Sequence, residues 1–300
     1  MQASTAGLVA DFRQYLVTER GLAARTIEHY TDAARIFLEA RCKEDDRPAG
    51  GWTAADVLRF IQCRAQVRRP VHMQQLCVGL RSFLRYLRFS GATERDLASS
   101  IPRIAHWRLA TIPKSLAQAQ VQTVLAHCDR GTAVGRRNFA ILLLLSRLGL
   151  RANEVRCLLL EDFDWAGGQL TIRGMGRGPE PMPLPTDVGE ALAAYLSDGR
   201  PTSTSRIVFL RAVPPYTQLV DGTVSSIICS VVTSAGIQVP SRGAHIFRHT
   251  LATQMLRGGA TLREIGQLMR HRDEDTTRIY AKVDLARLRT LAMPWLGGAA

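Results

Sequence analysis

Lysine is almost missing from this 300-residue chain, which contains only Lys43, Lys114 and Lys282. No lysine lies between positions 114 and 282, and arginine carries the positive charge there instead. Arginine offers a planar fork that matches phosphate oxygens, but it does not readily give up a proton. We attribute most of this bias to the base composition of the source genome, so the choice of arginine alone does not indicate a function.

The chain also lacks the features of a disulfide-bonded, metal-binding or membrane protein. Its six cysteines form no C-x-x-C pair, and no histidine lies near them at zinc-ligand spacing. We therefore expect reduced, buried thiols in a cytoplasmic protein, without a structural metal or a disulfide framework. The longest apolar run, residues 139–145, is too short to span a bilayer. Because the N-terminus shows no secretory signal pattern either, we expect no membrane partner.

Acidic residues are too few to balance the basic ones. Lysine and arginine number 39 against 26 aspartates and glutamates, which leaves a net charge of +13 and a pI near 10.2. Such an excess favours a polyanionic partner, because each neutralised phosphate releases condensed counterions. A basic protein that only avoids self-association has the same balance, so charge alone leaves the partner open. The length favours two domains, and 46% hydrophobic residues can form a sizeable core.

Residues 1–98 show only helical patterns. Apolar residues recur at helical spacing over residues 8–16 and 27–38. Thr53 is suited to begin a third helix, because its hydroxyl can accept from the first-turn amides. A fourth helix has one apolar face and is expected to stop at Gly91. The first 98 residues therefore predict a helical domain.

The polar face of that fourth helix carries an arginine stripe, formed by Arg81, Arg85 and Arg88. The stripe could lie along the phosphate backbone of DNA. A solvated helix face explains the same pattern equally well, so both interpretations stay open.

A second domain is expected from residue 115 to 300. Residues 99–114 contain two prolines and little periodicity, so we place a linker there. Residues 157–184 change to short apolar strands separated by glycine-rich turns, which predict a small antiparallel sheet. Helical patterns cover residues 116–126, 137–148, 187–197, 221–235, 244–257 and 261–270. The predicted fold is therefore mainly helical, with one small antiparallel sheet in the C-terminal domain.

Two arginines in this domain stand in sequence surroundings that suit a phosphate. A phosphodiester under attack concentrates negative charge on two non-bridging oxygens, and arginine forks stabilise that charge best when they are fixed in advance. Arg151 and Arg248 are the candidates, because each has functional-looking polar neighbours. Glu154 lies on the helical face of Arg151 and could orient it. An ordinary surface ion pair between Arg151 and Glu154 is the alternative.

Histidines accompany the second arginine. His245, Arg248 and His249 occupy positions i, i+3 and i+4, so they share one face at the start of a helix. A neutral histidine can accept a proton from a nucleophile at physiological pH. Single helix-face histidines are more often structural, and we assign that role to His249. His271 precedes a charged turn and could donate to a non-bridging oxygen.

Tyr280 is the candidate nucleophile. A phenol needs a base or cationic neighbours in order to attack, since its ordinary pKa is about 10. Tyr280 follows the His-x-x-Arg element, which none of the other five tyrosines does. A core tyrosine that packs beside Ile279 is the alternative.

In these motifs the chain resembles the tyrosine recombinases, also called the phage integrase family, over essentially its whole length. The matching segments are residues 149–154 (GLRANE), 245–250 (HIFRHT) and 269–272 (MRHR), followed by Tyr280. Residues 21–30 resemble part of the helical core-binding domain of that family. Any one segment is a weak match, but all of them in family order and spacing are highly specific.

The resemblance implies that Arg151, His245, Arg248 and His271 surround a scissile phosphate in a catalytic domain while Tyr280 attacks it. The products would be a 3′-phosphotyrosyl bond and a free 5′-hydroxyl, formed without ATP, metal or other cofactor. The implied partner is double-stranded DNA with a specific recombination site, in the nucleoid or on a mobile element. A homo-tetramer would hold two DNA duplexes.

The resemblance also implies a role for a C-terminal segment, and the chain departs from the family pattern at one position. A C-terminal segment over residues 284–296 would pack on a neighbouring subunit, or alternatively within its own chain. Similar family members usually carry Gly-Lys-Gly in the turn of the sheet, where the lysine protonates the leaving 5′ oxygen. Here Met175 stands between two glycines, and a thioether has no proton to give.

Loss of this general acid is expected to slow the reaction by about 10²–10⁴-fold. Arg177 lies nearby but is a poor acid, although it and Arg173 could still bind phosphate. We favour an introduced Lys-to-Met change at position 175, because the flanking glycines and the other site residues are intact. A naturally weakened member and the use of a different acid are the alternatives.

Two other functions fit the same motifs. A DNA-binding regulator or architectural protein could keep the fold without turnover. A topoisomerase could use the same tyrosyl chemistry without a specific site, although the family-like N-terminal domain argues against it.

Overall fold

The chain forms two compact units, residues 1–108 and 109–300, each with its own hydrophobic core. The computed structural model describes residues 5–44, 48–68, 70–104, 115–174, 178–239, 243–271 and 275–280. Among these residues, no helix is long and apolar enough to cross a membrane.

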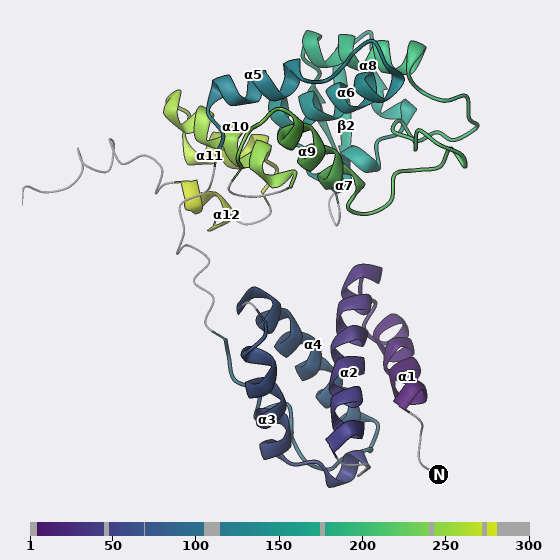
Figure 1. The fold of residues 1–300 in the computed structure, drawn as a ribbon, viewed down its shortest axis with the longest axis vertical. Helices are drawn as coiled ribbons and strands as arrows, with labels where there is room; N and C mark the ends of the chain where they lie inside the picture. The colour runs from purple at the N-terminus through teal and green to yellow at the C-terminus, as the bar shows by residue number, and fades with distance from the viewer. Residues whose placement is uncertain are drawn as a thin grey trace, which may run out of the picture. The chain divides into compact units, whose positions relative to one another are not determined.

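The N-terminal unit is helical, as the apolar spacing predicts (Figure 1). It contains α1 (Thr5–Thr18), α2 (Ala24–Glu44), the short 3-10 helix η1 (Ala49–Gly51), α3 (Ala54–Ala65) and α4 (Pro70–Phe89). Thr53 begins α3 with a capping box, in which its hydroxyl accepts from the Asp56 amide and its own amide donates to the Asp56 carboxylate. Gly91 follows α4 at φ +76°, a conformation that favours glycine.

The arginine stripe of α4 makes contacts within this unit. Arg81 donates from Nη2 to the carbonyl oxygens of Ile101 and Pro102, at 3.2 and 3.4 Å. Arg88 lies 3.8 Å from Asp96 in an exposed pair, and Arg85 is exposed. Arg81 therefore helps to hold the segment that follows α4, and a role for this stripe on DNA stays a prediction.

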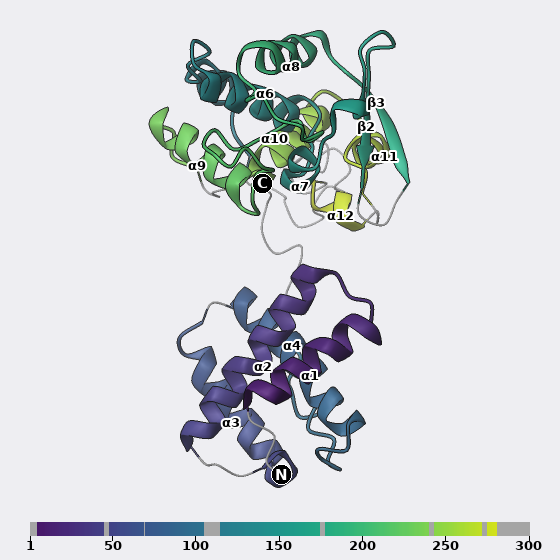
Figure 2. The same cartoon turned by 90° about the vertical axis from the view of Figure 1, so that its right-hand side faces the viewer.

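The C-terminal unit combines eight described helices with one small sheet (Figures 1 and 2). The helices are α5 (Gln118–Ala126), α6 (Ala133–Arg147), α7 (Ala152–Arg156), α8 (Thr186–Asp198), α9 (Thr223–Ser234), α10 (His245–Arg257), α11 (Leu262–Leu268) and α12 (Asp275–Arg278). The strands are β1 (Phe163–Asp164), β2 (Gln169–Arg173) and β3 (Pro179–Pro183), preceded by the 3-10 helix η2 (Leu160–Asp162). The mainly helical fold with one small sheet is confirmed.

Helix α6 is the central element of this unit. Residues 140–145 are buried on every side, which explains why this apolar run shows no polar face. The helix packs against α5, α7, α8, α9 and α10, and Figure 2 shows it in the interior of the unit. A helix held on all sides fixes the position of the turn that follows it, and the first candidate arginine lies just beyond that turn.

The sheet is antiparallel in the order β1-β2-β3. Leu170 pairs with Phe163 on one side and with Met182 on the other, and all three side chains are buried. The alternation of buried and exposed residues along β2 has the period of two expected for a half-buried strand. Met175 and Arg177 belong to the β2–β3 connection and lie outside the described residues.

Candidate active site

A glycine turn between α6 and α7 positions Arg151. Gly149 has φ +60°, and a Cβ at this position would lie 3.0 Å from the Met269 side chain and 3.2 Å from that of Leu251. Only glycine therefore fits both the left-handed backbone and the close approach of these side chains. The turn leads into Arg151, the N-cap residue of α7, whose side chain is 39% exposed.

Glu154 is a buried carboxylate that holds two arginines. Its Oε2 accepts from the Arg151 amide and from Arg270 Nη2, and its Oε1 accepts from Arg151 Nη1, each at 2.7 Å. Burial raises the pKa of Glu154, but the Arg151 amide and the two guanidinium charges outweigh it, so the pKa is lowered overall. This arrangement differs from an ordinary surface ion pair, because the Glu154 side chain is only 7% exposed.

Arg248 is buried at the junction of two chain segments. Its guanidinium donates to the carbonyl oxygens of Gly149 and Met269. Arg151 donates from Nη2 to the next carbonyl along, that of Arg270, at 3.2 Å. Burial first, and then the charge of Arg151, lower the pKa of Arg248 to about 10, so this arginine is still a cation at neutral pH. The turn after α6 and the end of α11 are therefore joined through both arginines.

Tyr280 lies against this cationic cluster within its own chain. Its side chain is only 1% exposed, and its hydroxyl is 2.8 Å from Nδ1 of His249. Its ring also stacks on His271, with centroids 6.5 Å apart and planes 5° from parallel. His245 lies one turn earlier on α10, with its ring 6.3 Å from that of His249. The residue that contacts the candidate nucleophile is thus His249, to which the sequence analysis assigned a structural role.

The surroundings set the protonation of these rings. Burial and neighbouring cationic groups lower the pKa of His249 and of His271 to about 4. Partial loss of solvation, Arg248 and Arg151 also lower the pKa of His245. Burial raises the pKa of Tyr280 to about 12, although Arg248 opposes the shift. At neutral pH the imidazoles of His249 and His271 are therefore uncharged, and the phenol keeps its proton.

The structure brings together five of the residues singled out in the sequence together with Glu154. Arg151 and Glu154 come from the N-cap and the body of α7, and His245 and Arg248 come from α10. His271 follows α11, and Tyr280 follows α12. The Nδ1 atom of His271 is 2.7 Å from the hydroxyl of Thr277, a buried residue of α12 that no sequence motif singled out. Its position three residues before Tyr280 was the available signal.

Other predicted residues lie elsewhere. Arg173 donates from Nε to Asp162 Oδ1 at 2.7 Å and so ties β2 to η2. The segment 284–296 and Arg177 lie outside the described residues, as does Met175. Within the part of the chain that the structure describes, no three His, Cys, Asp or Glu side chains are grouped to hold a metal ion.

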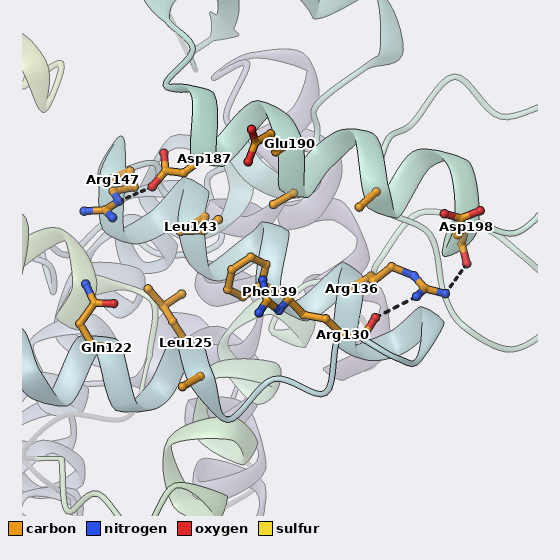
Figure 3. A pocket seen from close by; sticks show the side chains of 13 residues that line it. Gln122, Leu125, Arg130, Arg136, Phe139, Leu143, Arg147, Asp187, Glu190 and Asp198 are labelled. Atoms are coloured by element: carbon orange, nitrogen blue, oxygen red, sulfur yellow. Dashed lines mark hydrogen bonds and ion pairs between the residues drawn. The ribbon is translucent and has the colours of Figure 1, made fainter.

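A groove of about 800 Å³ between α5, α6 and α8 is separate from this cluster (Figure 3). Phe139 and Leu143 form part of its floor, and Arg147 pairs with Asp187 at one end, at 2.8 Å. None of the candidate site residues lines this groove. We therefore place the candidate site at the arginine and histidine cluster.

Comparisons with known proteins show the family from sequence, and solved structures show a shared fold. The model of the phage integrase family matches residues 114–287. The chain is 42% identical to integrase/recombinase y4rA of Sinorhizobium fredii, over 97% of this chain and 71% of that protein. It is 30% identical to the tyrosine recombinase XerD of Listeria monocytogenes, over 94% of this chain and 96% of that protein.

Two solved structures share the fold at low sequence identity. XerH site-specific recombinase, bound to a palindromic difH substrate in a post-cleavage complex, matches with a TM-score of 0.76 at 18% identity, over 96% of this chain and 84% of that one. A lambda integrase dimer bound to a COC′ core site matches with a TM-score of 0.71 at 12% identity, over 98% of this chain and 99% of that one.

Proposed function

Because the chain belongs to the phage integrase family, whose fold is that of site-specific DNA recombinases, we propose that it cuts and rejoins DNA through a covalent bond to Tyr280. One observation carries this proposal. The Tyr280 hydroxyl is 2.8 Å from a neutral imidazole, within its own chain and beside the buried Arg248. A phenol in such surroundings has an acceptor for its proton and a cation for the charge that develops.

In the proposed reaction, Arg151, Arg248, His245 and His271 hold the scissile phosphate. Arg248 is fixed in advance by two carbonyl oxygens, and Arg151 is fixed by Glu154 and a third carbonyl. Groups fixed in advance need not reorganise when charge builds on the non-bridging oxygens. The partly exposed side chain of Arg151 leaves it accessible to a phosphate.

The attack forms a bond between the Tyr280 oxygen and phosphorus, and it breaks the bond from phosphorus to the 5′ oxygen. The phenol proton passes to His249, whose Nδ1 is the acceptor at 2.8 Å. Met175 cannot supply the proton for the leaving 5′ oxygen, because a thioether carries none, so water supplies it in the proposed step. We retain an introduced Lys-to-Met change as the explanation for this position.

The proposal extends to the partner and to the assembly. Double-stranded DNA with a specific recombination site is the proposed partner, with four copies of the chain across two duplexes. XerH and lambda integrase share this fold, the first bound to a difH substrate and the second bound to DNA. The net charge of +13 supports a nucleic-acid partner independently. We propose a mobile element as the setting, as the resemblance implies.

A covalent-capture experiment tests this function. The chain is incubated with a pool of nicked duplexes that carry randomised arms, so that a cleaved strand loses its attacking hydroxyl and the adduct accumulates. Denaturing electrophoresis should show a protein–DNA adduct for the wild-type chain, more of it for Met175→Lys, and none for Tyr280→Phe. Sequencing the captured strands would give the recognised site.

A DNA-binding protein without turnover is the second candidate, and a methionine natural to position 175 would favour it. That reading predicts no adduct even for Met175→Lys, together with sequence-selective retention of duplexes from the same pool. A topoisomerase would instead give adducts without any shared sequence among the captured strands.

A further inference from the structure

Arg270 has a backbone conformation that is costly for an arginine. Its φ is +49°, and it is the only non-glycine residue with a positive φ in the described part of the chain. The turn is a Schellman-type end of α11, in which the His271 amide donates to Gly266 and the Arg270 amide donates to Gln267. Glycine usually occupies such a position, so an arginine there needs compensating contacts.

Those contacts come from a buried side chain. Arg270 is 8% exposed, and its Nη2 lies 2.7 Å from Glu154 Oε2. Its Nη1 lies against the sulfur of Met182 on β3 and 3.4 Å from the Leu268 carbonyl. A charge buried this deeply is stable only when it is paired with an opposite charge, and Glu154 provides that charge. Arg270 therefore joins the end of α11 to α7 and to the sheet.

The shared carboxylate also sets the charge available at Arg151. Glu154 binds Arg151 through Oε1 and Arg270 through Oε2, so these three side chains together carry one net positive charge. Without Arg270, the carboxylate would neutralise Arg151 alone. The carbonyl of Arg270 also accepts from Arg151 Nη2, which fixes a second edge of that guanidinium.

We propose that Arg270 is a positioning residue for strand cleavage. It leaves the cluster around Glu154 with a net positive charge, keeps Arg151 aimed through Glu154, and holds His271 beside Tyr280 through its left-handed turn. This inference rests on the proposed function for its rate measurement. The effect of Arg270 on the net charge beside Arg151 also predicts a change in DNA binding, which can be measured without cleavage. If Arg270 only stabilised the fold, replacing it in a protein that still folds would change neither the cleavage rate nor the salt dependence of DNA binding.

The test compares three substitutions at one position. Arg270→Met removes the charge at similar length, Arg270→Lys keeps the charge, and Arg270→Gly removes the charge while relieving the backbone. Arg147→Met is the matched control, because it removes an exposed ion pair with Asp187 on the separate groove. Circular dichroism at the assay temperature confirms that each variant is folded.

The first readout is single-turnover cleavage of the captured duplex at saturating protein. We expect Arg270→Met and Arg270→Gly to lose about tenfold to a hundredfold in rate, as for a misplaced catalytic group. Arg270→Lys should recover most of the rate, and Arg147→Met should match the wild type. Adding Glu154→Gln to Arg270→Met should recover part of the rate, because the amide no longer neutralises Arg151.

The second readout is the salt dependence of binding to a duplex recovered from the pool by retention. Arg270→Met should lower the slope of log K against log salt concentration by about 0.9, the value for one lost phosphate contact. Adding Glu154→Gln should restore that slope. If neither the wild type nor Met175→Lys makes an adduct, the proposed function is overturned. The salt dependence still tests the inference about Arg270 in that case, because binding does not require cleavage. A folded Arg270→Met protein with an unchanged slope, and with a rate within about twofold of wild type where cleavage occurs, overturns the inference.

Discussion

Replacing His249 separates two things that an imidazole can do for Tyr280. Its Nδ1 is 2.8 Å from the phenol hydroxyl, and in the proposed reaction that atom both accepts the hydrogen bond and takes the proton away. Asparagine places an oxygen near the position of Nδ1, so His249→Asn should keep an acceptor that cannot become protonated. His249→Phe removes both properties while keeping an aromatic ring.

The size of the effect follows from the burial of Tyr280. With a pKa of about 12, forming the free phenolate at pH 7.5 costs about 6 kcal/mol. A base that takes the proton during attack avoids part of this cost, and general bases contribute about 10²–10⁴-fold. We therefore expect His249→Asn to cleave more slowly than wild type by a factor in that range at pH 7.5, with His249→Phe at least as slow.

The dependence on pH distinguishes His249→Asn from the wild type more sharply than the rate itself. The wild-type rate should be flat from pH 7 to pH 9, because His249 has a pKa of about 4 and is already neutral. For His249→Asn the phenolate must form beforehand, so the rate should rise about tenfold per pH unit over that range. The assay is single-turnover cleavage of a duplex with sulfur as the 5′ leaving atom, which needs little protonation. A flat profile for His249→Asn at the wild-type rate would refute a base at this position, and His245 would then be the group to test.

Three other changes have defined outcomes. Met175→Lys should raise cleavage of ordinary DNA by about 10²–10⁴-fold and change cleavage of the sulfur-containing duplex little, whereas equal gains on both substrates would place the missing acid elsewhere. Lowering the pH from about 6.5 to 4 should reduce the urea midpoint of unfolding. His249 and His271 have pKa values of about 4 when folded and about 6.5 when unfolded, so the unfolded chain binds more protons over this range. Replacing both histidines with asparagine should flatten that dependence. Gly149→Ala should cost about 1–2 kcal/mol for its left-handed backbone and more for the 3.0 Å contact of its Cβ, measured by denaturation, while Gly168→Ala, at the same φ with open space around its Cβ, should show the backbone cost alone.

Local patterns in the sequence predicted the helices and the sheet because each carries its own signal. The apolar spacing over residues 27–38 marks α2, and Thr53 begins α3 through a cap that only neighbouring residues form. The glycine-rich turns of residues 157–184 likewise predicted short strands, which the structure contains. These signals are local, and distant parts of the chain hardly alter them.

The contacts within the site could not be read in the same way. Helical spacing placed His249 on the face of His245, but it did not show that Tyr280 would approach Nδ1 of His249. The sequence also contains no sign that Arg270 adopts a left-handed backbone or that it shares Glu154 with Arg151. Such contacts depend on how α7, α10 and α11 meet in three dimensions, and the spacing along any one helix does not determine that.

Arg248 binds main-chain oxygens, and this has a consequence for protein engineering. The carbonyls of Gly149 and Met269 are present whatever the neighbouring side chains are. This anchoring therefore requires a particular path of the main chain but few particular side chains. Exposed positions of α11 such as Arg263 and Gln267 could be randomised in a library without removing an anchor of the buried guanidinium. Variants with new surface properties, for example altered solubility or attachment points for labels, should therefore be obtainable on this helix while the chemistry beneath it is preserved.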